Sequence, residues 1–131
     1  MSIDLFVSYD YDNDKHYKNL LVAWNSHDRF DLEFYDHSVG VSVNSEDASY
    51  IRRVIKDKIS RCTHFLCLVG AQTSKSEWVE WEIDKAVEMG KQIIAVKIEN
   101  SYTSPEALLG VGAKWARSFT FSAISDAISD Y

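Results

Sequence analysis

Apolar residues recur along the chain in two periods, one typical of β-strands and one typical of α-helices. Short apolar runs at 3–8, 64–69 and 93–98 have the length of buried strands, and the alternating segment 31–36 suggests a strand buried mainly on one face. The stretches between these runs carry apolar residues at helical spacing. Strands and helices are therefore expected to alternate.

Two helices are expected ahead of the central strand. The first follows the polar loop 9–14, and the second follows Ser45 and ends near Cys62. Each carries one apolar stripe, with intervals of three and four residues, that would face a core. The stripes are Tyr17, Leu20, Leu21 and Trp24 in the first helix and Ile51, Val54, Ile55 and Ile59 in the second.

A third helix is expected over 75–89. Ser74 followed three residues later by Glu77 is a capping-box pattern, and Gly90 is a typical C-terminal stop. The helix has an apolar stripe and a mixed stripe beside it. The apolar stripe consists of Val79, Ile83, Ala86 and Val87. The mixed stripe consists of Trp78, Trp81, Glu82 and Lys85.

The pattern after residue 98 is less regular. Pro105 can start a short helix that ends at Leu109, 117–121 can form a fifth strand, and 124–128 a terminal helix. The chain 1–131 therefore fits a single α/β domain of the flavodoxin-like type. Its five-stranded parallel sheet is expected in the order 2-1-3-4-5, with helices on both faces.

Sheets of this type bind ligands beyond the carboxyl ends of their strands, at the point where the strand order reverses. Here that point lies between the first and third strands. The loops 9–14, 37–45 and 70–76 are therefore expected to surround a site, and Glu82 on the third helix is near enough to reach it.

Glu82 has two interpretations. Trp78 lies one helical turn before it on the same face, and a partly exposed carboxylate against an indole ring suits a substrate pocket. Alternatively, Glu82 pairs with Lys85 on a solvated face while the tryptophans fill core edges.

Composition argues against several classes of protein. The net charge of −6 is unfavourable for gripping nucleic acid or an anionic membrane surface, and the basic residues between 52 and 61 are interspersed with acidic ones. No apolar run approaches the roughly 20 residues of a membrane span, and the first residues do not resemble a secretion signal. Cys62 and Cys67 match neither a disulfide scaffold nor a metal site, so a reduced, cytoplasmic protein is expected.

Motifs of other proteins with this topology are missing. The third strand ends at 69–72 without the acceptor aspartate of a two-component receiver, and the bulky, acidic loop 9–14 does not suit the phosphate of a flavodoxin. The chain also has no Walker A loop, no GxGxxG, no nucleophile elbow and no paired Cys or His at metal spacing. Neither a metal nor a resident cofactor is expected.

Three segments together resemble a TIR domain. They are the opening strand 5–9, the strand 65–70 and the sequence Ser-Glu-Trp-Val-Glu-Trp-Glu-Ile at 76–83. The last is similar to the family motif Ser-x-Trp-Cys/Val-x-x-Glu-Leu/Ile. The resemblance covers nearly the whole chain and points to the small bacterial TIR-like proteins of the Thoeris anti-phage systems. The loop 37–44 does not reproduce the receptor-type loop of animal TIR adaptors, which argues against Toll signalling.

The resemblance implies an enzyme whose substrate is NAD+ and whose catalytic carboxylate is Glu82. Such an enzyme breaks the nicotinamide–ribose bond, and a cyclic ADP-ribose isomer is the expected product, with plain ADP-ribose as the alternative. A downstream effector would sense the cyclic product. The resemblance also implies self-association through TIR–TIR contacts, and neither nucleic acid nor a membrane is expected as a partner.

Further substrate contacts are expected from residues at the three loops and on the third helix. They are Ser8, Tyr9, Asp10, Asp36, His37, Ser74 and Trp78. Asp10 is an awkward neighbour for a pyrophosphate unless the acidic side chains of its loop turn outward as helix caps or bind ribose hydroxyls. Asp36 and His37 are equally compatible with an ordinary polar strand end.

Two other interpretations remain open. The chain can be a non-catalytic TIR-like module that assembles with itself or with other TIR domains, with Trp81, Arg52 and Arg53 in the interface. Alternatively, assembly completes the active site, and an isolated domain is inert.

Overall fold

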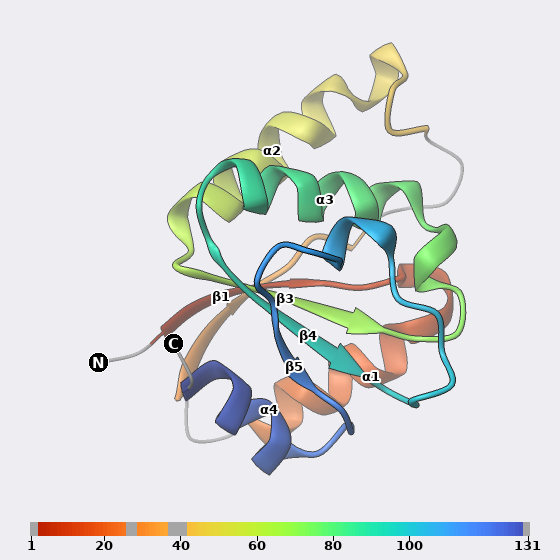
Figure 1. Cartoon of the computed structure of the whole chain (residues 1–131). Helices are drawn as coiled ribbons and strands as arrows, with labels where there is room; N and C mark the ends of the chain where they lie inside the picture. The colour runs from red at the N-terminus through yellow and green to blue at the C-terminus, as the bar shows by residue number, and fades with distance from the viewer. Residues whose placement is uncertain (1–2, 26–28, 37–41, 130–131) are drawn as a thin grey trace.

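Strands and helices alternate along residues 3–25, 29–36 and 42–129, which are the residues that this computed structural model describes. In chain order the elements are β1 (Ile3–Ser8), α1 (Tyr11–Trp24), β2 (Phe30–Glu33), η1 (Glu46–Ala48), α2 (Ser49–Arg61), β3 (His64–Val69), η2 (Thr73–Lys75), α3 (Glu77–Glu88), β4 (Gln92–Lys97), η3 (Glu106–Leu108), β5 (Lys114–Ala116) and α4 (Phe121–Ser129). The strands form one parallel sheet in the order β2-β1-β3-β4-β5 (Figure 1). The predicted fold class and strand order are confirmed.

Helices cover both faces of the sheet. Figure 1 shows α2 and α3 on one face and α1 and α4 on the other. The pleat of β3 divides its side chains between two cores, because successive residues of a strand point to opposite faces. Phe65 and Cys67 pack under α2 and α3, whereas Leu66 and Leu68 pack against α1 and α4. All four are fully buried, which explains the continuous apolar run of this strand.

The end of β1 lies at the switch point of the sheet. Ser8 is paired with Cys67 in the parallel register between β1 and β3. Phe6 packs in the core under α2 and α3, and Ser8, two residues later, shares its face of the pleat. Tyr9 packs in the opposite core, against α1 and α4. The strand end therefore sends one polar side chain toward α3.

The first helix begins earlier than predicted. Tyr11 is its first residue, so most of the predicted loop 9–14 is helical. Asp10 is the N-cap, and its carboxylate accepts from the backbone N–H of Asp12 at 3.3 Å and from Nδ2 of Asn13 at 2.7 Å. Acidic side chains are favourable there because they meet the unpaired N–H groups and the positive end of the helix dipole.

The third helix begins later than the capping-box pattern predicts. The short turn η2 precedes it, and the N-cap is Ser76 rather than Ser74: Ser76 Oγ accepts from the backbone N–H of Val79 at 3.2 Å. Glu77 does not close the predicted box. Its carboxylate accepts from the backbone N–H of Val43 at 3.1 Å, and this bond ties the start of α3 to the segment that precedes α2.

Two strands differ from their predicted bounds. β2 leaves the sheet after Glu33 instead of continuing to residue 36. The fifth strand is β5 and not 117–121, because Trp115 and Ala116 are the residues that pack on the core beside β4. The positive φ of Gly90, 72°, fits its predicted place at the end of α3.

The buried face of α3 is rotated relative to the predicted stripe. It consists of Trp78, Val79, Glu82, Ile83 and Ala86. Val87, expected in the apolar stripe, is 39% exposed. Trp78 and Glu82 therefore face the sheet instead of lying beside the core.

This rotation predicts unequal effects of two substitutions on α3. Ile83→Ala should lower the free energy of unfolding by about 2–5 kcal/mol, because it leaves a cavity in a fully buried position. Val87→Ala should change it by less than about 1 kcal/mol. Urea unfolding measures both, and equal effects would contradict this orientation of the helix.

Candidate active site

A buried carboxylate lies at the carboxyl end of β1. Glu82 is 1% exposed, and its Oε1 accepts a hydrogen bond from Ser8 Oγ at 2.7 Å. α3 carries Glu82 toward the sheet, and the pleat of β1 turns Ser8 to meet it. Burial of a carboxylate costs free energy unless polar groups compensate, so the Ser8 hydroxyl helps to hold Glu82 in place.

The surface-pair interpretation of Glu82 is wrong. Lys85 Nζ instead lies 3.0 Å from Glu88 Oε2, in an i,i+3 pair at the surface of α3. Glu82 is also more deeply buried than the partly exposed position expected for it. It is a carboxylate of the interior, not of a solvated face.

Aromatic side chains lie on the same helix as the carboxylate. Trp78, one turn before Glu82 on the same buried face, is 8% exposed. Its ring meets Trp81 edge-on, with centroids 5.8 Å apart. An indole beside a carboxylate supplies an apolar surface and excludes water from the carboxylate.

Asp14 is a second buried carboxylate, which the sequence pattern did not single out. It is 4% exposed, and Thr73 Oγ1 donates to its Oδ2 at 3.1 Å while accepting from the backbone N–H of Gly70 at 2.8 Å. A Cβ at Gly70 would lie 2.2 Å from Asp14 Oδ2, so a glycine leaves the space that this carboxylate fills. Of the acidic residues in the predicted loop, Asp10 caps the helix but Asp14 turns inward.

The two buried carboxylates approach the ends of the adjacent strands β1 and β3 from opposite faces of the sheet. Glu82 comes from α3 and Asp14 from α1. Burial raises the pKa of the Cys67 thiol in β3, and the charges of Glu82 and then Asp14 raise it further. Cys67 therefore lies within the electrostatic reach of both groups.

Tyr9 and Asp36, both predicted at the site, are in direct contact. The Tyr9 hydroxyl donates to Asp36 Oδ1, and Lys18 Nζ lies 3.6 Å from the same oxygen. Lys18, which the sequence analysis missed, is 6% exposed, and its ammonium lies 4.2 Å from the centroid of the Phe34 ring. Burial lowers the pKa of Lys18, and the charge of Lys15 adds to the effect. These contacts tie the segment after β2 to α1.

The remaining predicted site residues take no part in the Ser8–Glu82 and Tyr9–Asp36 contacts, or lie outside the described residues. Asp10 serves as the cap of α1, and Ser74 is half-buried in η2. His37 lies outside the described residues. Substrate contact by these three residues, and by the other predicted site residues, stays a prediction.

The described residues contain neither a metal-binding cluster nor a helix that could span a membrane. No group of three or more His, Cys, Asp or Glu in that part of the chain is arranged to hold a metal ion. Nor is any helix within it both long and apolar enough to cross a membrane.

The arrangement suits chemistry that develops positive charge on a sugar. A carboxylate surrounded by protein stabilises a nearby cationic centre more strongly than one in water does. The bond from Ser8 shows that the Glu82 carboxylate accepts from a hydroxyl, and sugars offer hydroxyl donors.

A model of one protein family matches most of the chain. Residues 6–103 match the family described as Thoeris protein ThsB, TIR-like domain. The comparison with curated proteins found no match.

Several solved structures share the fold at low sequence identity. The Clostridium botulinum CMP N-glycosidase BcmB is 14% identical with a TM-score of 0.66, and 96% of this chain and 98% of that chain are covered. A 2-desoxiribosyltransferase from Leishmania mexicana is 12% identical with a TM-score of 0.64, and 98% of each chain is covered. The TIR domains of the activated Roq1 resistosome, which recognises the pathogen effector XopQ, are 14% identical with a TM-score of 0.54, over 76% of this chain and 61% of that one.

The environment of Asp14 predicts a pH dependence of stability. Burial raises the pKa of Asp14 above its ordinary value of 3.8, the hydrogen bond from Thr73 lowers it in part, and the charge of Asp10 adds to the rise. The folded protein therefore holds this proton more tightly than the unfolded chain does. Asp14 contributes stability at low pH that is lost as the pH rises from 3.8 through the folded pKa.

Asp14→Asn, which cannot ionise, should therefore gain stability relative to the wild type as the pH rises. Urea unfolding of both proteins from about pH 4 to pH 7 measures the difference. A difference in unfolding free energy that stays constant over this range would contradict a raised pKa at Asp14.

Proposed function

The chain belongs to the family of Thoeris ThsB TIR-like domains, and from this membership we propose that it is an enzyme that breaks the nicotinamide–ribose bond of NAD+. The product would be a cyclic ADP-ribose isomer that acts as a signal in anti-phage defence. The observation that carries the proposal is the buried Glu82 carboxylate, which accepts from the Ser8 hydroxyl at the switch point of the sheet. Solved structures of this fold named as an N-glycosidase and as a 2-desoxiribosyltransferase support chemistry at glycosidic bonds.

Glu82 is suited to this reaction because the leaving group needs no proton. Nicotinamide in NAD+ carries a positive charge, and both electrons of the broken bond leave with its ring nitrogen. The ribose is left with oxocarbenium character. A carboxylate at the ribose stabilises this charge and accepts hydrogen bonds from the ribose hydroxyls.

Ser8 has a positioning role in this proposal. Its hydroxyl fixes one oxygen of Glu82 before substrate arrives, as the 2.7 Å hydrogen bond indicates. A ribose hydroxyl offers the same kind of donor, so it can take the place of Ser8 or add to it without leaving the carboxylate unsatisfied.

The product depends on which nucleophile reaches the ribose. An adenine nitrogen or a hydroxyl of the same molecule gives a cyclic product that has lost only nicotinamide, whereas water gives ADP-ribose. In both cases the attacking group forms the new bond to the ribose carbon, and any proton that it releases passes to a base or to solvent. The buried Trp78 beside Glu82 favours the cyclic product because it excludes water.

Burial of Glu82 links catalysis to assembly in this proposal. At 1% exposure, the carboxylate meets substrate only when the side chains over it move. Self-association through TIR–TIR contacts would supply that movement and would make turnover depend on protein concentration. A downstream effector that senses the cyclic product completes the proposed system.

Glu82→Gln should reduce NAD+ turnover at least about 100-fold, because it removes the charge that stabilises the transition state while it keeps the size of the side chain. Glu80→Gln is the matched control, since Glu80 lies on the exposed face of the same helix. Mass-resolved chromatography of NAD+ incubated with concentrated protein, alone and with lysate of phage-challenged cells, measures both loss and product. Near-ultraviolet circular dichroism of each variant verifies the fold.

The expected product has the mass of NAD+ minus nicotinamide and depends on Glu82. A product with the mass of water added would replace the cyclase with a hydrolase. Wild-type turnover by Glu82→Gln would contradict the assignment of Glu82. Survival of NAD+ in every setting would instead favour the non-catalytic assembly module.

A further inference from the structure

A pocket with basic walls lies between α2 and α3. Its volume is about 340 Å³, and its lining consists of Ser49, Arg52, Arg53, Lys56, Trp81 and Lys85. The lining follows helical spacing on both sides: i, i+3, i+4 and i+7 on α2, and i and i+4 on α3. Two packed helices therefore present a continuous rim of four cationic side chains.

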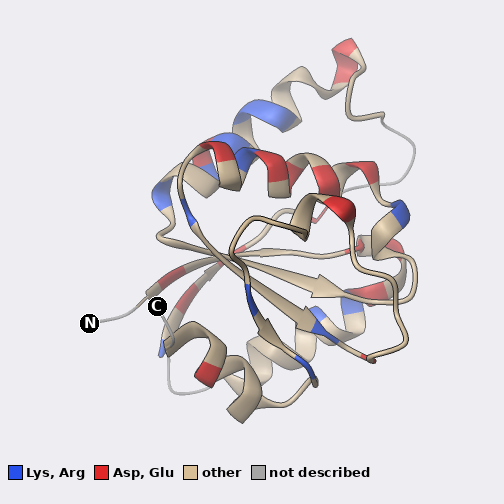
Figure 2. Cartoon of the chain, in the orientation of Figure 1, with Lys and Arg blue, Asp and Glu red and all other residues tan. Residues whose placement is uncertain are grey.

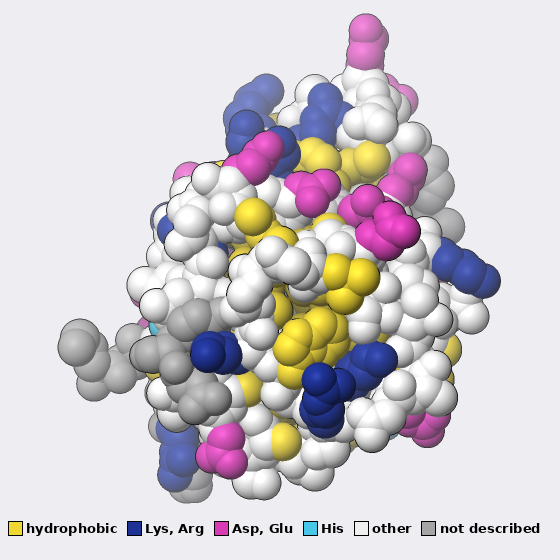
Figure 3. Space-filling model, in the orientation of Figure 1, with side chains coloured by type: hydrophobic (Ala, Val, Ile, Leu, Met, Phe, Trp, Pro, Cys, Tyr) yellow, Lys and Arg dark blue, Asp and Glu magenta, His cyan; other side chains and the backbone are white. Residues whose placement is uncertain are grey.

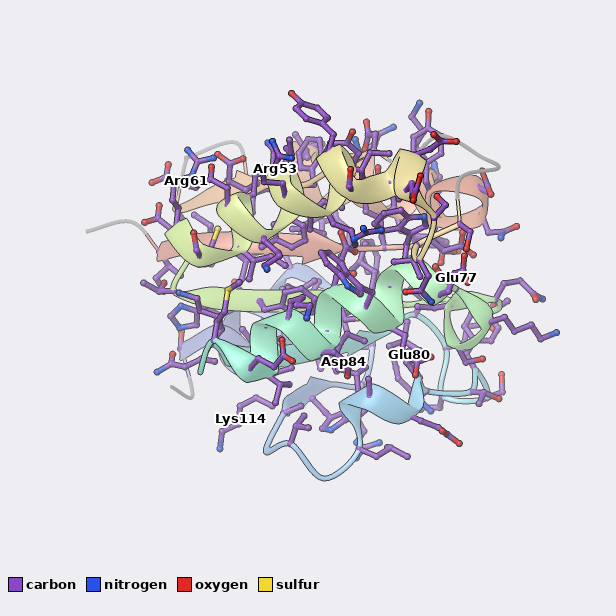
Figure 4. All side chains as sticks on the ribbon, turned by 90° about the horizontal axis from the view of Figure 1, so that it is seen from above. Arg53, Arg61, Glu77, Glu80, Asp84 and Lys114 are labelled. Carbon is purple, nitrogen blue, oxygen red and sulfur yellow. The ribbon has the colours of Figure 1, made fainter. Side chains whose placement is uncertain are left out.

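The cations of this pocket stand out against the rest of the molecule. The chain has a net charge of −6, yet Figure 2 shows basic residues concentrated on α2 and acidic ones on α3. Figure 4 shows Glu80 and Asp84 on the side of α3 away from α2, so these carboxylates lie away from the pocket. In Figure 3, Lys and Arg side chains gather over α2 beside hydrophobic ones.

Most of the positive charge in the pocket is not neutralised by a carboxylate. Arg52 donates from Nη1 to the backbone carbonyls of Val43 and, at 3.0 Å, of Ser45; these bonds fix the side chain but leave its charge. Among the described residues, neither the Arg53 nor the Lys56 side chain has an ion pair or a hydrogen bond.

Two ion pairs engage carboxylates that lie near pocket residues in the sequence. Lys85 forms an ion pair with Glu88, whose Oε2 lies 3.0 Å from Lys85 Nζ. Asp57, next to Lys56 in the chain, is engaged by Arg61, whose Nη2 lies 3.2 Å from Asp57 Oδ2. The neighbouring acidic side chains thus leave the charged groups of Arg52, Arg53 and Lys56 available for an external anion.

Trp81 adds an apolar wall to the same pocket. Its indole is half-buried, with Trp78 edge-on at 5.8 Å and the Lys85 ammonium 5.7 Å from its centroid. Guanidinium and ammonium groups bind phosphate, and an indole provides a flat surface for an aromatic base. The volume is within the range of small-molecule pockets.

We propose that the pocket between α2 and α3 is a second binding site, which takes a nucleotide through its phosphates at Arg53 and Lys56 and through its base at Trp81. Glu82 takes no part in this site, because it points from α3 into the sheet and not toward α2. The site therefore stands whether or not Glu82 acts on NAD+.

Isothermal titration of the full chain with ADP tests the proposal, with pyrophosphate and adenosine as partial ligands. ADP should bind more tightly than either, because only ADP engages both the cations and Trp81. Arg53→Glu and Lys56→Glu should each weaken ADP binding about tenfold or more, as expected for the loss of a charge-assisted hydrogen bond. Trp81→Leu should bring ADP to the affinity of pyrophosphate.

Arg61→Glu is the matched control. It makes the same charge change on the same helix, but Arg61 is at the end of α2 and does not line the pocket (Figure 4). This variant and Glu82→Gln should both bind ADP like the wild type. Under the proposed function, Glu82→Gln removes NAD+ turnover but leaves ADP binding intact. Failure of the proposed NAD+ cleavage can therefore be distinguished from failure of the proposed nucleotide site.

Four results would overturn the proposal. The first two are the absence of ADP binding and an equal loss of ADP affinity in Arg61→Glu and Lys56→Glu. The third is a loss of ADP affinity in Glu82→Gln, which would place ADP in the substrate site. The fourth is binding of an acidic peptide but not of ADP, which would make the pocket a protein interface.

Discussion

The hydrogen bond between Ser8 and Glu82 joins the two parts of the molecule on which the proposed chemistry depends. It links the end of a central strand to a helix across the core, between residues 74 positions apart in the chain. A carboxylate at this depth is tolerated only with polar partners, so the fold must bring β1 and α3 together before Glu82 can occupy this position. The parallel order of the sheet, with β3 between β1 and β4, achieves this.

Each face of the sheet buries a different carboxylate. The face under α3 holds Glu82 beside an indole, in surroundings that strengthen its interaction with a cation. The opposite face holds Asp14, which Thr73 fixes over the end of β3. Two buried carboxylates at the ends of adjacent strands are costly for a domain of this size, and such costs are concentrated at functional sites.

The sequence predicted the sheet order and the buried face of α2, because both depend on periodicity. The stripe predicted for α1 is only partly right, since Leu21 is buried but shares its face with Asp14 and Lys18. One motif singled out Glu82, whose role stays a prediction. The sequence did not predict the burial of Glu82 or Asp14. Each carboxylate is buried against a partner from a distant element, Ser8 for Glu82 and Thr73 for Asp14. The local spacing of residues does not identify such a partner. The start of α3 was misplaced for a related reason: Glu77 fits a capping box locally but bonds to a distant backbone N–H.

Under the proposed function, Glu82 is the residue that meets the ribose of NAD+. A crystal structure of Glu82→Gln with NAD+ bound would test it most directly, since this variant should keep the substrate intact. We expect a hydroxyl of the nicotinamide-bearing ribose within hydrogen-bonding distance of residue 82, with Ser8 displaced from it or sharing it. NAD+ bound with both riboses remote from residue 82 would contradict the claim.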